Sequence, residues 1–217
     1  MKDFRDLKLI IFDCDGVLFD SLKANAEFYN EIARRAGRHE LSQEELNYCH
    51  MHTAEESIEF IFRHFPHLFK KAYDSYKAMD YGDFLKYMEI EPAMVETVTN
   101  LRSRFHTAIS TNRSTTMPRL RQIYNLDALF DKIVCALDVK RPKPHPEGVW
   151  MILESFDLRP KNAVYIGDSA VDEEVSRNAG VDFIAYKNKE LDAVFHVEHF
   201  SELSSFLMDV QREKGSL

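Results

Sequence analysis

Residues 10–21 read IIFDCDGVLFDS, and this stretch decides the fold. An apolar run over residues 7–12 leads directly into Asp13 and Asp15, and a glycine follows. A short, unbroken apolar run is typical of a strand that is buried on both faces, as in a parallel sheet. Two carboxylates placed two residues apart at the end of such a strand repel each other. The stretch therefore predicts a buried strand whose carboxyl end carries a cation-binding site.

Three similar apolar runs follow, over residues 107–110, 163–166 and 182–186. Helical patterns lie between them, as over residues 92–105 and 146–156. Strands that alternate with helices predict an α/β fold, in which a Rossmann-like parallel sheet carries helices on both faces.

Residues 20–91 break this alternation because they contain no convincing strand. Apolar residues recur at helical spacing over 21–36 and 55–65. Asp20 or Ser21 can cap the start of the first helix, and Gly37 its end. We therefore expect an all-helical domain over 20–91, inserted into a core made of residues 1–19 and 92–217.

The composition is that of an ordinary globular protein. The chain has 217 residues, of which 45% are hydrophobic and 29% charged, with a net charge of −8. This charge argues against nucleic acid and against an anionic membrane surface as partners. An odd number of cysteines (Cys14, Cys49 and Cys135), no CxxC pattern and no export signal together favour a cytoplasmic protein. No pattern specifies an oligomeric state.

Polar residues follow the predicted strands where ligands bind in open α/β sheets, beyond their carboxyl ends. We expect one site to collect residues from three strand ends and one proline-rich loop: Asp13, Asp15, Thr111, Asn112, Lys143, Asp168 and Asp172.

These residues have the chemistry of a phosphoryl site. Asp13, Asp15 and Asp168 offer the hard oxygen ligands that Mg²⁺ prefers. Lys143 adds a second positive charge, and the Thr111 hydroxyl can donate to a phosphate oxygen. A carboxylate in such a site is free to attack phosphorus.

Each signal alone is weak, and the combination carries the interpretation. D-x-D occurs by chance in acidic chains, and aspartates at strand ends often cap helices or form turns. Asp168 and Asp172 alone could be an N-cap and a first-turn acid. A competing pattern, the C-x5-R spacing from Cys135 to Arg141, reads CALDVKR and lacks the glycines of a phosphate-binding loop.

The chain resembles the haloacid dehalogenase superfamily, on its phosphoglycolate phosphatase and β-phosphoglucomutase side. The resemblance rests on four motifs in the family's order: DCDGVLFDS, ISTNR, RPKPHPEG and GDSAVDEEVSRNAGV. It implies a Rossmann-like core with a helical cap over 20–91, which sets substrate specificity.

The resemblance also implies a role for each residue. Asp13 is the nucleophile that forms an aspartyl phosphate, and Asp15 is the general acid and then the base. Thr111, Asn112 and Lys143 bind the phosphate, and Asp168 holds the metal. Asp172, beyond this shell, orients a metal-bound water or Lys143.

The resulting hypothesis is a Mg²⁺-dependent phosphatase that acts on a small phosphorylated metabolite, in the manner of a phosphoglycolate phosphatase. One alternative is a phosphomutase that returns the phosphate to a sugar. The other is a phospho-accepting signalling module like a receiver domain, and the large insert argues against it.

Overall fold

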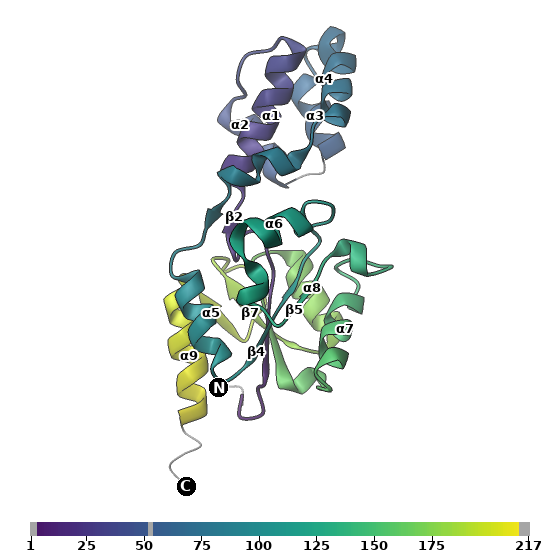
Figure 1. Ribbon diagram of the computed structural model, residues 1–217. Coiled ribbons are helices and arrows are strands. Elements are labelled where there is room, and N and C mark those ends of the chain that lie inside the picture. The colour runs from purple at the N-terminus through teal and green to yellow at the C-terminus, as the bar shows by residue number, and fades with distance from the viewer. Residues whose placement is uncertain (1–3, 52–53, 213–217) are drawn as a thin grey trace. The chain divides into compact units, whose positions relative to one another are not determined.

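The computed structural model describes residues 4–51 and 54–212. Six parallel strands form the central sheet in the order β5-β4-β1-β6-β7-β8 (Figure 1). Their bounds are β1 Leu9–Phe12, β4 His106–Ser110, β5 Lys132–Val134, β6 Ala163–Gly167, β7 Asp182–Tyr186 and β8 Phe195–Val197.

Helices cover both faces of this sheet, as α/β alternation predicts. Helices α5 (Met94–Arg102) and α9 (Phe200–Arg212) lie on one side, and α7 (Glu147–Ser155) and α8 (Ala170–Ala179) lie on the other (Figure 1). Side chains of β1 alternate between the two faces. Leu9 and Ile11 share a core with Val149 of α7, whereas Phe12 stacks on Phe200 of α9.

The strand order reverses at β1, which positions the candidate site. The chain runs outward through β4 and β5 on one side of β1, and through β6, β7 and β8 on the other. Phe12 pairs with Ile109 of β4 and with Ile166 of β6. The carboxyl ends of these three strands therefore meet where open α/β sheets bind ligands.

The chain divides into two compact units, Met1–Phe19 with Ile90–Leu217 and Asp20–Glu89. The second unit has its own hydrophobic core, which includes Phe28, Ile32 and Phe62. Its elements are α1 (Leu22–Ala36), α2 (Gln43–Met51), α3 (Ala54–Phe62), α4 (Pro66–Ala78) and the 3-10 helix η1 (Tyr81–Tyr87).

Helix α1 begins and ends close to the predicted caps. Asp20 Oδ1 accepts a hydrogen bond from Leu22 N at 2.8 Å, whereas the N-cap Ser21 makes no side-chain capping bond. Gly37 ends the helix at φ 97°, a left-handed conformation that glycine adopts without steric cost.

Two short strands correct the expectation of an all-helical insert. β2 (Phe19–Asp20) pairs with β3 (Glu89–Ile90) in a separate two-stranded sheet, and most of this ribbon falls within 20–91. Two residues per strand are too few to show an alternating pattern in the sequence. The remaining elements are α6 (Met117–Tyr124) and the 3-10 helices η2 (Leu126–Ala128), η3 (Ala136–Asp138) and η4 (Pro160–Asn162).

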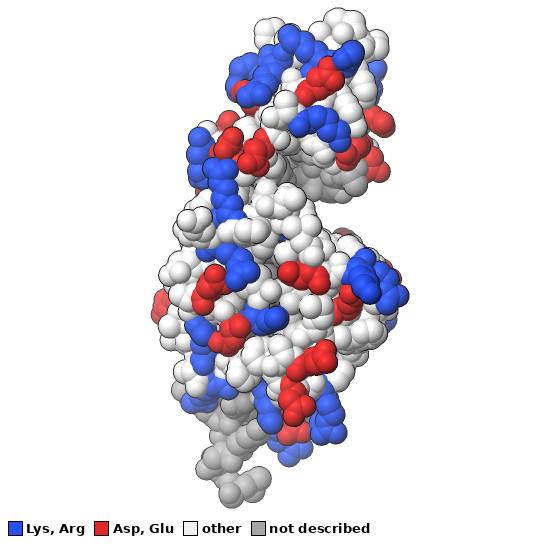
Figure 2. Space-filling view, turned by 45° about the vertical axis from the view of Figure 1, so that its right-hand side comes forward, with Lys and Arg blue, Asp and Glu red and all other residues white. Residues whose placement is uncertain are grey.

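The surface carries charges of both signs. On the face in Figure 2, Lys and Arg are interspersed with Asp and Glu. Within residues 4–51 and 54–212, no helix has the length and apolar character needed to span a bilayer.

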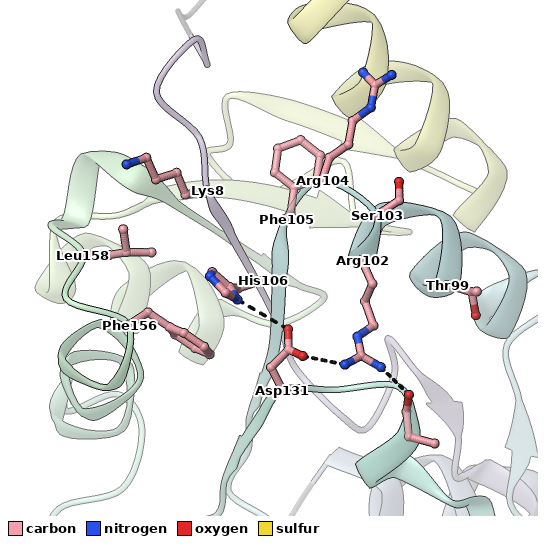
Figure 3. Close-up of a pocket in the computed structure, with 11 residues that line it drawn as sticks. Lys8, Thr99, Arg102, Ser103, Arg104, Phe105, His106, Asp131, Phe156 and Leu158 are labelled. Atoms are coloured by element: carbon pink, nitrogen blue, oxygen red, sulfur yellow. Dashed lines mark hydrogen bonds and ion pairs between the residues drawn. The ribbon is translucent and has the colours of Figure 1, made fainter.

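A cavity of about 860 Å³ lies at the edge of the sheet where β1 and β4 begin, opposite their carboxyl ends (Figure 3). Asp131 is the anion of this cavity, and its side chain is 26% exposed. It accepts hydrogen bonds from Thr107 N at 3.0 Å and Arg102 Nη2 at 2.5 Å, and His106 Nδ1 lies 3.7 Å away. Burial opposes ionisation of Asp131, but these donors outweigh it and lower its pKa. This cluster ties β4 to the start of β5.

We expect Asp131→Asn to lower the free energy of unfolding by about 1–2 kcal/mol at pH 7. A carboxyl with a lowered folded-state pKa stabilises above its unfolded pKa, and this contribution is lost as pH falls through the folded value. The difference between the two proteins should therefore shrink below pH ~4. Urea unfolding of both proteins at pH 7 and pH 3 measures this difference in the free energy of unfolding. Asp127→Asn removes an exposed pair with Arg121 and should change stability by less than about 0.5 kcal/mol. An equal loss in both variants would contradict the assignment.

Candidate active site

Asp13 follows β1 and lies between the ends of β4 and β6. Its N–H donates to Ile166 O at 2.9 Å, which continues the ladder between β1 and β6 by one step. Its Oδ1 accepts a hydrogen bond from Lys143 Nζ at 2.7 Å. Within residues 4–51 and 54–212, Oδ2 has no hydrogen-bond partner. Asp13 therefore presents one held and one open oxygen, the state a nucleophilic carboxylate requires.

Lys143 is the central cation of this cluster. Its ammonium donates to Asp13 Oδ1 and Asp172 Oδ1, each at 2.7 Å, and to the Tyr165 hydroxyl at 3.0 Å. Its side chain is only 7% exposed. Burial disfavours the ammonium, but the two carboxylates outweigh it and raise the pKa of Lys143 well above its ordinary value.

Asp172 is buried, and both of its carboxylate oxygens are occupied. Oδ1 faces Lys143 and Tyr165, while Oδ2 accepts from Ser169 Oγ at 2.6 Å and from the N–H groups of Asp168 and Ser169. Burial opposes its ionisation, but Lys143 and these donors outweigh it and lower its pKa. Because it is saturated, Asp172 acts as a fixed negative charge that orients Lys143.

Two glycines allow the backbone to approach these carboxylates. Gly16 has φ 79°, and a Cβ there would collide with the carboxylate of Asp168. A Cβ on Gly167 would collide with Asp172. Gly16 of DCDG and Gly167 of GDS are therefore required sterically, because a carboxylate packs directly against the backbone at each position.

The site carries more negative than positive charge. Oxygens of Asp13, Asp168 and Asp172 lie within 4.8 Å of one another, with Lys143 among them. Burial, and then the charge of Asp172, raises the pKa of Asp168 to about 7. The same causes raise the pKa of Asp13. Asp13 and Asp168 both have open oxygens, so this donor set fits a hard divalent cation.

Asp15 lies outside this acidic cluster. Its carboxylate faces Arg113, whose Nε donates to Oδ2 at 3.1 Å and whose Nη2 donates to Oδ1. The three carboxylates of the cluster are those of Asp13, Asp168 and Asp172, and the role of Asp15 as a metal ligand stays a prediction. Arg113 provides Asp15 with a cation of its own.

Thr111 and Asn112 follow β4. Thr111 is buried, and its Oγ1 accepts from the Arg113 N–H at 3.0 Å, so its own hydroxyl proton remains available to a ligand. The Asn112 side chain makes two bonds to the Lys143 backbone: Oδ1 accepts from N at 2.9 Å, and Nδ2 donates to O at 3.0 Å. Asn112 therefore holds the Lys143 loop, and its contact with substrate stays a prediction.

Sequence reasoning missed Arg113, Tyr165 and Ser169. Arg113 directly follows Thr111 and Asn112 in ISTNR, and this adjacency is the signal that could have found it. Tyr165 reads as an apolar residue of the AVYI strand, although its hydroxyl donates to Ser110 O at 2.8 Å. Ser169, rather than Asp168, is the N-cap of α8, and its hydroxyl also donates to Asp172.

The cysteines do not provide an alternative nucleophile. Cys14 is fully buried between the two aspartates, and burial raises its thiol pKa well above the ordinary value. Burial and the neighbouring Asp138 raise the pKa of Cys135. Arg141, the other half of the C-x5-R spacing, pairs with Glu147 instead. All three cysteines are reduced.

Comparisons with known proteins agree with this geometry. A family model described as haloacid dehalogenase-like hydrolase matches residues 10–186. A crystal structure of a HAD-superfamily hydrolase, subfamily IA, variant 1, from Geobacter sulfurreducens is 36% identical. It covers 93% of this chain and 97% of its own, with a TM-score of 0.87.

Two curated relatives carry phosphatase names. The phosphorylated carbohydrates phosphatase of Thermotoga maritima is 28% identical over 184 residues, which cover 82% of this chain and 84% of the relative. Pyrophosphatase PpaX of Bacillus cereus is 26% identical over 184 residues, 80% of each chain.

Proposed function

The chain belongs to the haloacid dehalogenase-like hydrolases, and from this premise we propose that it is a Mg²⁺-dependent phosphatase of small phosphomonoesters. The observation that carries the proposal is the excess of negative charge around Asp13. Two buried carboxylates, Asp13 and Asp172, share the Lys143 ammonium, the partly buried Asp168 lies beside them, and Asp13 and Asp168 keep open oxygens. A divalent cation and a phosphoryl group together complete such a site.

The proposed metal ligands are the carboxylates of Asp13 and Asp168. When bound, Mg²⁺ would neutralise charge on the phosphoryl oxygens and on the carboxylates. Lys143 would contact a phosphoryl oxygen while it holds Asp13 Oδ1 in place. The Thr111 hydroxyl would donate to a second oxygen.

The proposed reaction has two steps. Asp13 Oδ2 attacks phosphorus, the bond from phosphorus to the ester oxygen breaks, and Asp15 gives its proton to that leaving oxygen. Asp15 then takes a proton from water, which attacks phosphorus and releases Asp13 and inorganic phosphate. This sequence regenerates both aspartates. We assign substrate selection to the insert, residues 20–91, as a cap domain.

Phosphate release from about a hundred phosphorylated metabolites, including phosphoglycolate, sugar phosphates and pyrophosphate, tests the function. We expect turnover of a small set of monoesters in Mg²⁺, at least 10³-fold loss in EDTA and recovery when Mg²⁺ is added back. Ca²⁺ should inhibit, because its larger shell suits this geometry less well.

Three results would contradict the proposal. Full turnover after exhaustive chelation would remove the metal from the reaction. Sugar phosphate isomerisation that requires a bisphosphorylated activator would identify a phosphomutase. A phosphoenzyme that persists without turnover would identify a signalling module.

A further inference from the structure

Asp13 and Asp15 are each paired with a different cation, which arrives from a different loop. Lys143, from the RPKPHP loop, contacts Asp13 and Asp172, and Arg113, from the segment after β4, contacts Asp15. Two carboxylates that are two residues apart could easily compete for one cation. Because Asp13 pairs with Lys143 and Asp15 with Arg113, the two carboxylates point in different directions.

Two guanidinium nitrogens of Arg113 donate hydrogen bonds to Asp15, one to each carboxylate oxygen. A two-point contact of this kind fixes the plane of the carboxylate as well as its position. The exposures are unequal: the Arg113 side chain is 7% exposed, and that of Asp15 is 36% exposed. The arginine is thus the buried, fixed partner, and the aspartate is the group that faces outward.

Arg113 is itself held at several points. Its Nη1 donates to Thr116 Oγ1 at 3.0 Å, its N–H donates to Thr111 Oγ1 at 3.0 Å, and its carbonyl accepts from Ala136 N at 3.0 Å. Two of these contacts use backbone atoms, so a side-chain substitution leaves them available. A substitution of the Arg113 side chain therefore removes its hydrogen bonds to Asp15 but keeps the backbone N–H bond to Thr111 Oγ1.

We propose that Arg113 is a positioning residue that orients the carboxylate of Asp15 for its two proton transfers. This inference rests on the proposed function, in which Asp15 protonates the leaving oxygen and then activates water. An Asp15 freed from Arg113 can rotate about its side-chain bonds, and a displacement of about 1 Å can cost 10²-fold in rate. Arg113 would act through Asp15 alone, without contact with the substrate.

The experiment compares two substrates of similar shape, p-nitrophenyl phosphate and p-nitrobenzyl phosphate. The phenolate leaves with little help, whereas the benzyl alkoxide requires a proton. Single-turnover experiments, with enzyme in excess over substrate and Mg²⁺ present, measure the rate at which each alcohol is released. In the proposed reaction this rate equals the rate at which Asp13 is phosphorylated. We expect Arg113→Gln to slow p-nitrobenzyl phosphate about 10- to 100-fold and p-nitrophenyl phosphate by less than about threefold. Half-saturating substrate concentrations should stay within about threefold.

Two variants separate orientation from charge and from folding. Arg113→Lys keeps the charge but cannot bind both carboxylate oxygens in one plane, so it should share the defect of Arg113→Gln. Arg121→Gln removes an exposed arginine that pairs with Asp127 and should leave both rates unchanged. Equal thermal midpoints would show that the Arg113 variants are folded.

A double-mutant cycle decides whether Arg113 acts through Asp15. In the Asp15→Asn background, Arg113→Gln should cause no further loss with either substrate. Equal losses with both substrates, a further loss in the Asp15→Asn background, or full rescue by lysine would overturn the inference. If Asp15→Asn is defective and Arg113→Gln is normal, only the inference fails. If Asp15→Asn hydrolyses p-nitrobenzyl phosphate normally, the proposed acid–base role of Asp15 fails as well.

Discussion

Asp13→Asn should be inactive on every phosphate ester that the parent hydrolyses, with kcat lowered by at least about 10⁴-fold. The amide is a poor nucleophile, so no covalent bond to phosphorus forms. Every other group in the site remains, including the Lys143–Asp172 pair at 2.7 Å. Phosphate release measures the loss, and intact-mass analysis of protein quenched during turnover shows whether phosphate is bound covalently. A phosphoryl adduct on Asp13→Asn would show that another residue is the nucleophile.

The same variant should be more stable than the parent when metal is absent. Burial and the charge of Asp172 raise the pKa of Asp13, so the folded protein disfavours its ionised form. A raised carboxyl pKa lowers stability at pH values above the unfolded pKa, and asparagine removes this effect. We therefore expect a higher melting temperature for Asp13→Asn in EDTA at pH 8. Opposite changes in activity and stability would distinguish the loss of a nucleophile from unfolding.

Lys143→Met should lower both activity and stability. The ammonium is the cation shared by Asp13 and Asp172, and removing one partner of a buried ion pair costs about 3–5 kcal/mol. Turnover should fall at least 10³-fold, because the nucleophile loses its orientation and the phosphoryl oxygens lose a donor. Urea unfolding and phosphate release measure the two effects.

The matched control is Lys161→Met. Lys161 pairs with Asp6 at 3.2 Å, and both side chains are exposed, so this change should cost less than about 1 kcal/mol and leave activity intact. Equal losses in the two lysine variants would indicate that the buried cluster has no special role. A stable but inactive Lys143→Met would indicate that the cluster tolerates its excess charge and that the lysine serves the reaction alone.

The sequence predicts the parts of the fold that carry long or strongly patterned signals. The apolar runs around Ile10, Ile109, Val164 and Ile184 are strands of the sheet. β5 and β8 are missed because each has only three residues, which is too few for an apolar run to stand out. Helix ends move by a few residues, as for the pattern over 92–105, which the structure places at Met94–Arg102.

The site is predicted less completely because contacts between distant residues leave no local pattern. Asp13, Asp168 and Lys143 follow from strand ends and a proline-rich loop, and the structure brings them together. The pairing of Asp15 with Arg113 joins residues that lie 98 positions apart. Nothing near Asp15 in the sequence indicates this partner, and the role of Asp15 as a metal ligand stays a prediction.

The short ribbon of β2 and β3 has a consequence for how the chain folds. β1 pairs with β4 through contacts such as Leu9 with His106, so the native sheet requires a long loop to close. The insert has a core of its own and begins and ends at neighbouring strands. If it folds first, a loop of about a hundred residues becomes one of about thirty, which lowers the entropic cost of closure by about 1 kcal/mol. Such a reduction in effective contact order speeds the pairing of β1 with β4, so the insert would act as a folding aid for the sheet that it interrupts.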